Sequence, residues 1–257
     1  MSDHNEIVKQ SFTVQARAYA AQPWIADADR MLRLLAIAKL KSEDRILDVA
    51  CGPGYVTEAF SQQCREAVGI DLTEAPLRIA EERCRARGLE NVRFLAGDVQ
   101  QLPFADGEFD LAVCRLAVHH FAQPQRVLDE MARVCRRGGT ILLEDTVASE
   151  HAGRAAYQHQ IEVLRDPSHT RTLPLCEVLV LFRDAGVEIH TVATGMIDLE
   201  AERWLATTKT QPGPAAEVRR LFEADMARDL SGMRPFLDAQ AQLHFCHLTA
   251  IVAGRKL

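Results

Sequence analysis

A regular alternation of short apolar strands and helices over residues 45–145 restricts this chain to few folds. Residues 45–50 have the pattern of a buried strand that closes in a Gly/Pro turn at 52–54. Further strands are expected at 67–70, 91–96, 109–114 and 140–143. Helical patterns separate most of these strands, which is typical of βαβ units in a parallel sheet. Right-handed crossovers would then place ligands at the carboxyl ends of the strands.

The flanking segments have other patterns. Residues 1–40 look helical and amphipathic, and residues 146–172 are polar and rich in histidine. Later in the chain we expect a helix at about 174–185, strands at 187–193 and about 244–252, and a mostly helical stretch at 198–240 with a break at Pro212-Gly213-Pro214. The segments 146–172 and 198–240 are insertions beside the last strands, and we expect them to form a lid over a pocket at the strand ends.

A length of 257 residues corresponds to between one and two domains. We predict a single α/β domain over 1–257, with a three-layer Rossmann-like fold. Its seven-stranded, mostly parallel sheet would carry helices on both faces. The expected parts are a helical cap at 1–40, a cofactor-binding core at 41–145, and lid insertions at 146–175 and 195–243 that would form the acceptor site.

Composition excludes several classes of partner. The net charge of −6 argues against nucleic acid and anionic membrane surfaces. The longest run without a charged residue, 239–254, is too short and too polar to span a membrane. The polar N-terminus is unlike a secretory signal, and the 7 scattered cysteines lack any C-x-x-C pair. We therefore expect a cytoplasmic protein with reduced thiols and no metal site. Either a monomer or a homodimer is compatible with the sequence.

Three acidic residues follow three consecutive strands. Asp48 precedes the glycine turn, Asp71 follows it by roughly 20 residues, and Asp98 comes after the third strand. Position 57 is Thr57, so the turn departs from the G-x-G-x-x-G dinucleotide pattern. An acidic turn suits a ligand that carries an ammonium and a sulfonium better than a diphosphate. Asp71 can accept ribose hydroxyls and Asp98 an adenine amino group, unless they serve only as a helix cap and a turn residue.

The motifs D-x-A-C-G-P-G, G-I-D, G-D-V-x-x-L-P-F-x-D-x-x-F-D and R-R-G-G-T together resemble a class I S-adenosylmethionine-dependent methyltransferase. The resemblance is strongest to the broad group that includes the ubiquinone/menaquinone-biosynthesis methyltransferases. It implies S-adenosylmethionine as cofactor and methyl transfer as activity. Carried over by position, the cofactor-binding residues would be Tyr19, Asp48, Ala50, Gly52, Gly54, Asp71, Leu72, Asp98, Val99 and Arg115. Of these, Tyr19 would close over the cofactor carboxylate, and the Arg115 backbone would meet the methionyl amino group.

Methyl transfer is an in-line displacement, so alignment and exclusion of water do most of the catalysis. A base is needed only where the acceptor must lose a proton. His119 and His120 follow the fourth strand, where the methyl group should point, and they are the candidate bases. The alternative is that one or both are structural.

The acceptor is expected to be a small molecule methylated on O, C or N. The chain lacks the N-V-x-D stretch of the quinone-biosynthesis enzymes, which argues against quinone precursors. It also lacks N-P-P-Y and D-P-P-Y, which argues against DNA, many RNA and protein-glutamine acceptors. A nicotinamide-dependent reductase is disfavoured by Thr57. A protein that binds the cofactor without transferring methyl remains an alternative.

The acceptor pocket should come from the N-terminal helices and the two insertions. Polar and aromatic candidates there are Trp24, His151, Tyr157, His159, His169, Arg171, Arg203 and Trp204. Within this set His169, Arg171 and Trp204 are the predicted substrate residues. An arginine at 171 could receive a carboxylate or a phosphate of the acceptor.

Overall fold

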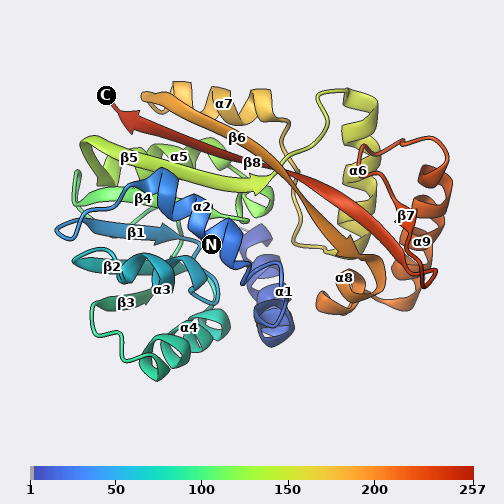
Figure 1. Cartoon of the computed structure of the whole chain (residues 1–257), viewed down its shortest axis with the longest axis horizontal. Coiled ribbons are helices and arrows are strands. Elements are labelled where there is room, and N and C mark those ends of the chain that lie inside the picture. The colour runs from blue at the N-terminus through green and yellow to red at the C-terminus, as the bar shows by residue number, and fades with distance from the viewer. Residues whose placement is uncertain (1–2) are drawn as a thin grey trace.

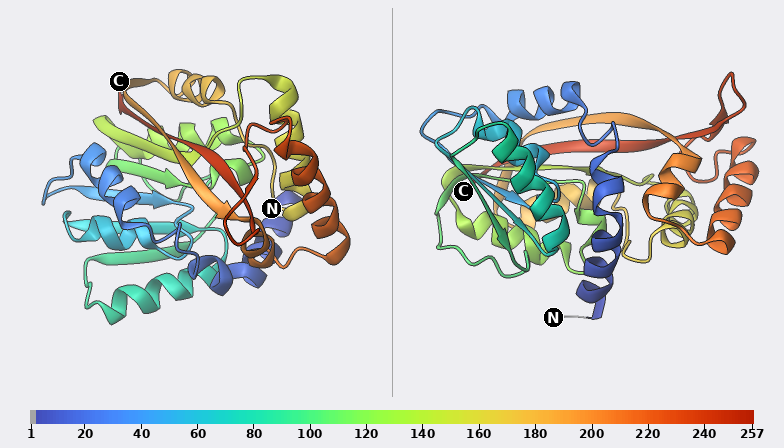
Figure 2. Two further views of the ribbon diagram at one scale, coloured as in Figure 1. Left: turned by 45° about the vertical axis from the view of Figure 1, so that its right-hand side comes forward. Right: turned by 90° about the horizontal axis from the view of Figure 1, so that it is seen from below.

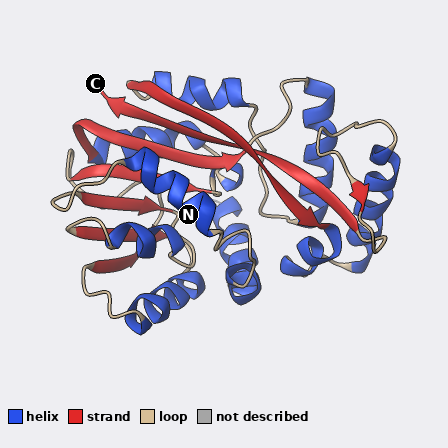
Figure 3. Cartoon of the chain, in the orientation of Figure 1, coloured by secondary structure: helices blue, strands red, loops and turns tan. Residues whose placement is uncertain are grey.

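The computed structural model describes residues 3–257 and contains one eight-stranded sheet (Figures 1 and 3). The strands are β1 (Arg45–Val49), β2 (Glu66–Asp71), β3 (Val92–Ala96), β4 (Phe109–Arg115), β5 (Cys135–Thr146), β6 (Val187–Glu200), β7 (Phe236–Leu237) and β8 (Leu243–Lys256). Their order is β3-β2-β1-β4-β5-β8-β6, and β7 pairs with β8. The first five strands are parallel, whereas β8 runs antiparallel to β5 and β6.

The helices are α1 (Asp3–Ala20), α2 (Ala28–Ala38), α3 (Tyr55–Ser61), α4 (Glu74–Ala86), α5 (Pro124–Val134), α6 (Ala152–Arg165), α7 (Leu175–Asp184), α8 (Ala201–Thr207) and α9 (Pro212–Met226), with a 3₁₀ turn, η1, at Val118–His120. None of these helices is long and apolar enough to cross a membrane. The predicted α/β class and the mostly parallel sheet are confirmed.

Hydrophobic cores lie on both faces of the sheet, because successive side chains of a strand point to opposite faces. Leu47 and Val49 of β1 pack with residues of α5 and α7, whereas Ile46 packs with residues of α2 and α3. The layered arrangement expected from the sequence follows from this alternation.

A second lobe extends from the sheet. The long strands β6 and β8 leave the parallel core and carry a lobe formed with α6, α8 and α9 (Figure 1). It has its own core, which includes Ile161, Trp204, Phe222 and Phe245. Helix α1 lies between this lobe and the parallel strands (Figures 1 and 2).

The helical N-terminal segment is confirmed for the described residues, as two helices with a loop between them. The sequence prediction differs from the structure in three places. The histidine-rich segment contains α6. The stretch 198–240 is helical only in α8 and α9: β6 continues to Glu200, because it stays paired with β8 along its length. An eighth strand, β7, follows α9. Pro212 begins α9, where its missing N–H has no intrahelical partner to lose.

Candidate active site

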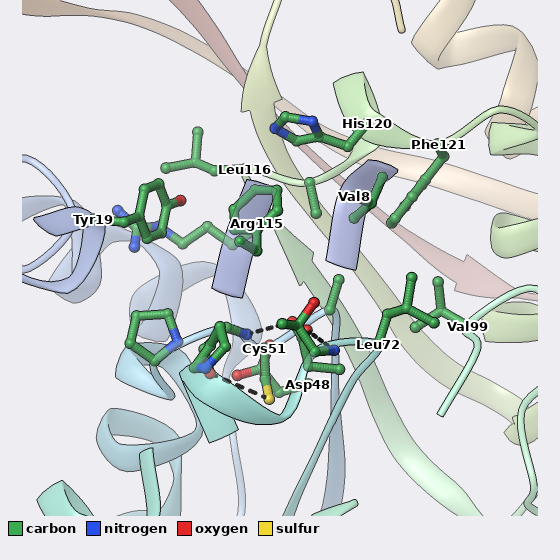
Figure 4. A pocket seen from close by; sticks show the side chains of 18 of the residues that line it. Val8, Tyr19, Asp48, Cys51, Leu72, Val99, Arg115, Leu116, His120 and Phe121 are labelled. Atoms are coloured by element: carbon green, nitrogen blue, oxygen red, sulfur yellow. Dashed lines mark hydrogen bonds between the residues drawn. The ribbon is translucent and has the colours of Figure 1, made fainter. Parts of the chain in front are cut away.

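A cavity opens at the carboxyl ends of β1, β2 and β4, beneath α1. Every predicted cofactor residue except Gly54 lines this first cavity. Figure 4 shows Asp48, Cys51 and Leu72 on one side of the cavity and Leu116, His120 and Phe121 on the other. Parallel strands therefore bring the three carboxylates to one rim.

The glycine turn after β1 is held by the acid at the end of β2. The backbone N–H of Gly52 donates to Asp71 Oδ2 at 2.9 Å, and the N–H of Thr73 donates to Asp71 Oδ1 at 2.8 Å. Burial raises the pKa of Asp71 to about 6. Asp71 does not cap a helical N–H of α4, because it bonds the N–H of the N-cap residue Thr73, and its carboxylate lines the cavity.

Gly54 has a packing role in this structure instead of a place in the cavity wall. Its φ of +75° is a left-handed conformation that disfavours side chains. A Cβ atom at Gly54 would lie 2.6 Å from the Cβ of Ala80, so the residue lets α3 begin close to α4. Gly52 differs, because a Cβ there would meet nothing within 4 Å.

Asp48 is buried at the end of β1 and pairs with the residue that replaces the third glycine. Its Oδ2 accepts hydrogen bonds from the Thr57 N–H at 2.9 Å and the Thr57 hydroxyl at 2.6 Å. Burial nevertheless raises the pKa of Asp48 to about 7. Thr57 therefore has a structural role at the position where a dinucleotide-binding fold has glycine, because its two hydrogen bonds hold Asp48.

Helix α1 and the following loop close the cavity from above. Asn5 donates from Nδ2 to Asp98 Oδ2 at 2.8 Å, and the N–H of Gln100 donates to Asp98 Oδ1 at 2.9 Å. Arg115 donates to Glu144 at 2.8 Å and to the carbonyl oxygen of Ile25 at 2.9 Å. The Arg115 side chain thereby ties β4 to the segment between α1 and α2.

A second cavity adjoins the first. Phe12, Tyr19, Leu116 and His120 line both cavities. His119, Glu162, Arg165, His169 and Trp204 line only the second, and β6, α6 and α8 of the lobe contribute to its wall. The two cavities therefore meet beside the histidine pair.

The side chain of His119 is held by an acid that we did not assign from the sequence. Its Nδ1 lies 2.6 Å from Asp145 Oδ1, at the end of β5. Asp145 Oδ2 accepts from the N–H of Val118 at 2.6 Å. Burial opposes the charged imidazole, but the Asp145 carboxylate outweighs burial and raises the pKa of His119. Its position in the sequence could have indicated this role, because Asp145 lies at the carboxyl end of β5, which is next to β4 in the sheet.

His120 has a different environment. Its Nδ1 lies 3.0 Å from the carbonyl oxygen of Ser168, so this nitrogen must carry the proton to form a hydrogen bond. Its ring packs edge-on against Phe12 with centroids 5.0 Å apart. Burial lowers the pKa of His120 to about 4. The ring is therefore neutral near pH 7.

The predicted acceptor residues separate into two groups. His169, Trp24 and Trp204 line the second cavity. Arg171 does not reach either cavity, because its guanidinium pairs with Glu177 on the surface. His151, Tyr157, His159 and Arg203 also lie outside both cavities. Arg165, which the sequence analysis did not single out, does line the second cavity. No cluster of three potential metal ligands occurs within residues 3–257.

Residues 47–143 match the family described as "Methyltransferase domain". The uncharacterized methyltransferase YcgJ of Bacillus subtilis is 28% identical over 250 residues, which are 95% of this chain and 97% of YcgJ. The crystal structure of YcgJ superimposes with a TM-score of 0.83 over 89% of this chain and 98% of that one.

The chain is also similar to one further protein in sequence and to another in structure. Demethylmenaquinone methyltransferase of Thermus thermophilus is 37% identical over 120 residues, which are 46% of this chain and 54% of that enzyme. A complex of geranyl diphosphate C-methyltransferase from Streptomyces coelicolor A3(2) with Mg²⁺, geranyl diphosphate and S-adenosylhomocysteine has a TM-score of 0.63 at 16% identity, over 90% of this chain and 79% of that one. At that identity the likeness shows a shared fold. These matches confirm the resemblance expected from the sequence: residues 47–143 match a methyltransferase domain, and the chain is similar to proteins named methyltransferases, including a demethylmenaquinone methyltransferase.

Proposed function

We propose that the first cavity binds S-adenosylmethionine and that the second cavity holds a small-molecule acceptor, with His119 as the general base. The observation that carries this proposal is the junction of the two cavities at His120, next to the pair formed by His119 and Asp145. A methyl donor on one side and an acceptor on the other would meet there. The acceptor atom is then O, N or an activated carbon.

The residues of the first cavity fit the cofactor chemically. The open space around Gly52 leaves room for a ligand against the turn, where a side chain would intrude. Asp71 keeps lone pairs on a buried carboxylate for the ribose hydroxyls, while Asp98 and Val99 would hold the adenine. Leu72 would contact the nucleoside. The methionine part would lie against Tyr19, Asp48, Ala50, Gly52 and Arg115, with Gly54 supporting the turn by its packing.

Two residues that line the first cavity have backbone conformations that fit a binding role. Ala50 and Leu116 have φ values of 56° and 54°, which non-glycine residues rarely adopt. They follow the adjacent strands β1 and β4, and both line the first cavity. Such strain concentrates at functional sites, where surrounding structure maintains it.

When bound, S-adenosylmethionine supplies an electrophilic methyl group on a sulfonium. His119 would prepare the acceptor: the Nδ1–H donates to Asp145, so the neutral ring keeps its lone pair on Nε2. The acceptor proton would move to Nε2 while the electron pair left on the acceptor atom bonds the methyl carbon, and the electron pair of the broken C–S bond would leave with the sulfur of the cofactor product. Asp145 stabilises the imidazolium that results. His120, neutral and packed on Phe12, would align the acceptor.

The test compares ligands in a thermal unfolding assay. S-adenosylhomocysteine should stabilise the protein by about 2.7 kcal/mol at a hundredfold excess over its Kd, and NAD should have no effect. A panel of phenols, quinols and carboxylic acids with labelled cofactor then measures transfer. Absence of stabilisation by S-adenosylhomocysteine would contradict the proposal. Binding without transfer to any acceptor would favour the alternative of a cofactor-binding protein.

A further inference from the structure

Arg165, at the end of α6, is a cation of the second cavity that forms no ion pair with a carboxylate of residues 3–257. Its Nε donates to the carbonyl oxygen of Trp204 at 3.3 Å, and its guanidinium carbon lies 4.4 Å from the centroid of the Trp204 indole. Among residues 3–257, no carboxylate forms an ion pair with Arg165, and its two Nη atoms have no hydrogen-bond partner. The two Nη groups of Arg165 are therefore available to donate hydrogen bonds to a ligand in the second cavity.

The other arginine near the reaction centre differs in this respect. Arg115 is bound by Glu144 and by a backbone carbonyl, so its charge is already compensated. An uncompensated charge in a partly buried place is unfavourable unless something pairs with it. The contrast indicates that the Arg165 side chain serves a ligand, whereas the Arg115 side chain serves the fold.

Two further polar atoms of the same cavity also lack partners. His169 Nε2 and Thr172 Oγ1 are buried and make no hydrogen bond with the described residues. The two residues are only 7% and 5% exposed, and both line the second cavity. A buried polar atom without a partner costs about 1–3 kcal/mol. Together with Arg165, these atoms are typical of a site that a polar ligand completes.

The acidic residues nearby restrict the charge of that ligand. Glu162 lies 2.8 Å from His247, and Asp166 accepts from Ser168 at 2.6 Å, so each has a partner of its own. Neither forms an ion pair with Arg165, although both interact with its charge through space and raise its pKa against the effect of burial, and both would repel a doubly charged phosphate. A monoanionic carboxylate fits better, because it matches the guanidinium fork with two hydrogen bonds.

We propose that the methyl acceptor is a small carboxylic acid whose carboxylate binds Arg165 while its reactive group faces His119 and His120. This inference rests on the proposed acceptor role of the second cavity. Arg165, His119 and His120 all line the second cavity, and His120 also lines the first, so an acceptor bound to Arg165 would extend toward the junction of the two cavities. The aromatic rings of Phe12, Tyr19 and Trp24 supply walls for its apolar part.

The test uses two matched pairs of probes: 4-hydroxybenzoate with 4-hydroxybenzamide, and lactate with lactamide. Calorimetric titrations are run with and without saturating S-adenosylhomocysteine. We expect at least one acid to bind at least tenfold more tightly than its amide. The preference should disappear in Arg165→Gln and persist in weakened form in Arg165→Lys. The matched control is Arg171→Gln, which removes a surface arginine and should leave the preference unchanged.

The outcomes separate the two proposals. Equal binding of acids and amides, including no binding of either, overturns the carboxylate inference, as does a preference that survives in Arg165→Gln. An unchanged affinity of Arg165→Gln for S-adenosylhomocysteine shows that the variant is folded. Failure of the wild type to bind S-adenosylhomocysteine would instead overturn the proposed function, whatever the acids do.

Discussion

Replacing Asp145 with asparagine should lower the pKa of His119 from above 6.5 to below 6.5. Asp145 provides the negative charge 2.6 Å from His119 Nδ1, and its two oxygens also accept from the N–H groups of Val118 and Thr146, each at 2.6 Å. Asparagine keeps one carbonyl oxygen but removes the charge. Burial, which already opposes the charged imidazole, then determines the direction of the shift.

The size of the change follows from the geometry. A hydrogen bond to a charged group contributes about 1.5–3 kcal/mol. We therefore expect Asp145→Asn to remove about 1.5–3 kcal/mol of stabilisation from the charged imidazole, which lowers the pKa of His119. The raised pKa stabilises the folded state below pH 6.5, and this stabilisation is lost as the pH rises through the folded-state value. Asp145→Asn should therefore reduce the free energy of unfolding more at pH 6 than at pH 9.

Histidine-labelled NMR spectra measure both the pKa and the tautomer, with His119→Gln used for assignment. The wild-type ring should carry its proton on Nδ1 when neutral. Asp198→Asn is the control, because Asp198 lies 2.7 Å from the distant His244. A wild-type pKa of His119 at or below 6.5, or one that Asp145→Asn leaves unchanged, would refute the reasoning and remove the basis for His119 as the base.

Three further predictions concern the cofactor, the turn and the base. Asp71→Asn should weaken S-adenosylhomocysteine binding about tenfold to a hundredfold in calorimetry, because hydrogen bonds to a charged group contribute about 1.5–3 kcal/mol. Wild-type affinity should also fall as the pH drops below about 6, where Asp71 becomes protonated, and a flat profile would contradict its role. Gly54→Ala should reduce the free energy of unfolding in urea by about 1–3 kcal/mol. The control Gly213→Ala, in a helix with open space around it, should be neutral or stabilising, and equal effects would refute the packing argument. Once an acceptor is identified, kcat/KM should rise with pH through the pKa of His119, above 6.5, whereas a rise near 4 would assign the base to His120.

The lining of the first cavity was largely predictable because many of its residues lie at or just after the carboxyl ends of consecutive strands. Asp48 and Asp71 lie at the carboxyl ends of β1 and β2, Asp98 follows β3, and the carboxyl ends of parallel strands meet at one edge. Gly54 was the exception, because its contact with Ala80 depends on how closely α3 approaches α4.

The acceptor side was less predictable because it is built from segments that are distant in the chain. Arg171 and Arg165 lie in the same polar stretch, and nothing local distinguishes them. Helix α6 turns Arg165 into the cavity and onto Trp204, whereas Arg171 follows the helix and pairs with Glu177. The length of β6 could not be predicted from its own sequence either. It depends on pairing with β8, which lies at the end of the chain.

The sequence alone therefore determined the parallel sheet, the glycine turn and the carboxylates along one rim, since each depends on a local pattern and on chain order. The tertiary structure decided which histidine forms a hydrogen bond with Asp145 and which arginine lines the second cavity. These features depend on the packing of side chains across β4, β5 and α6. Local periodicity carries no information about such pairings, because they are fixed only when separate elements come together.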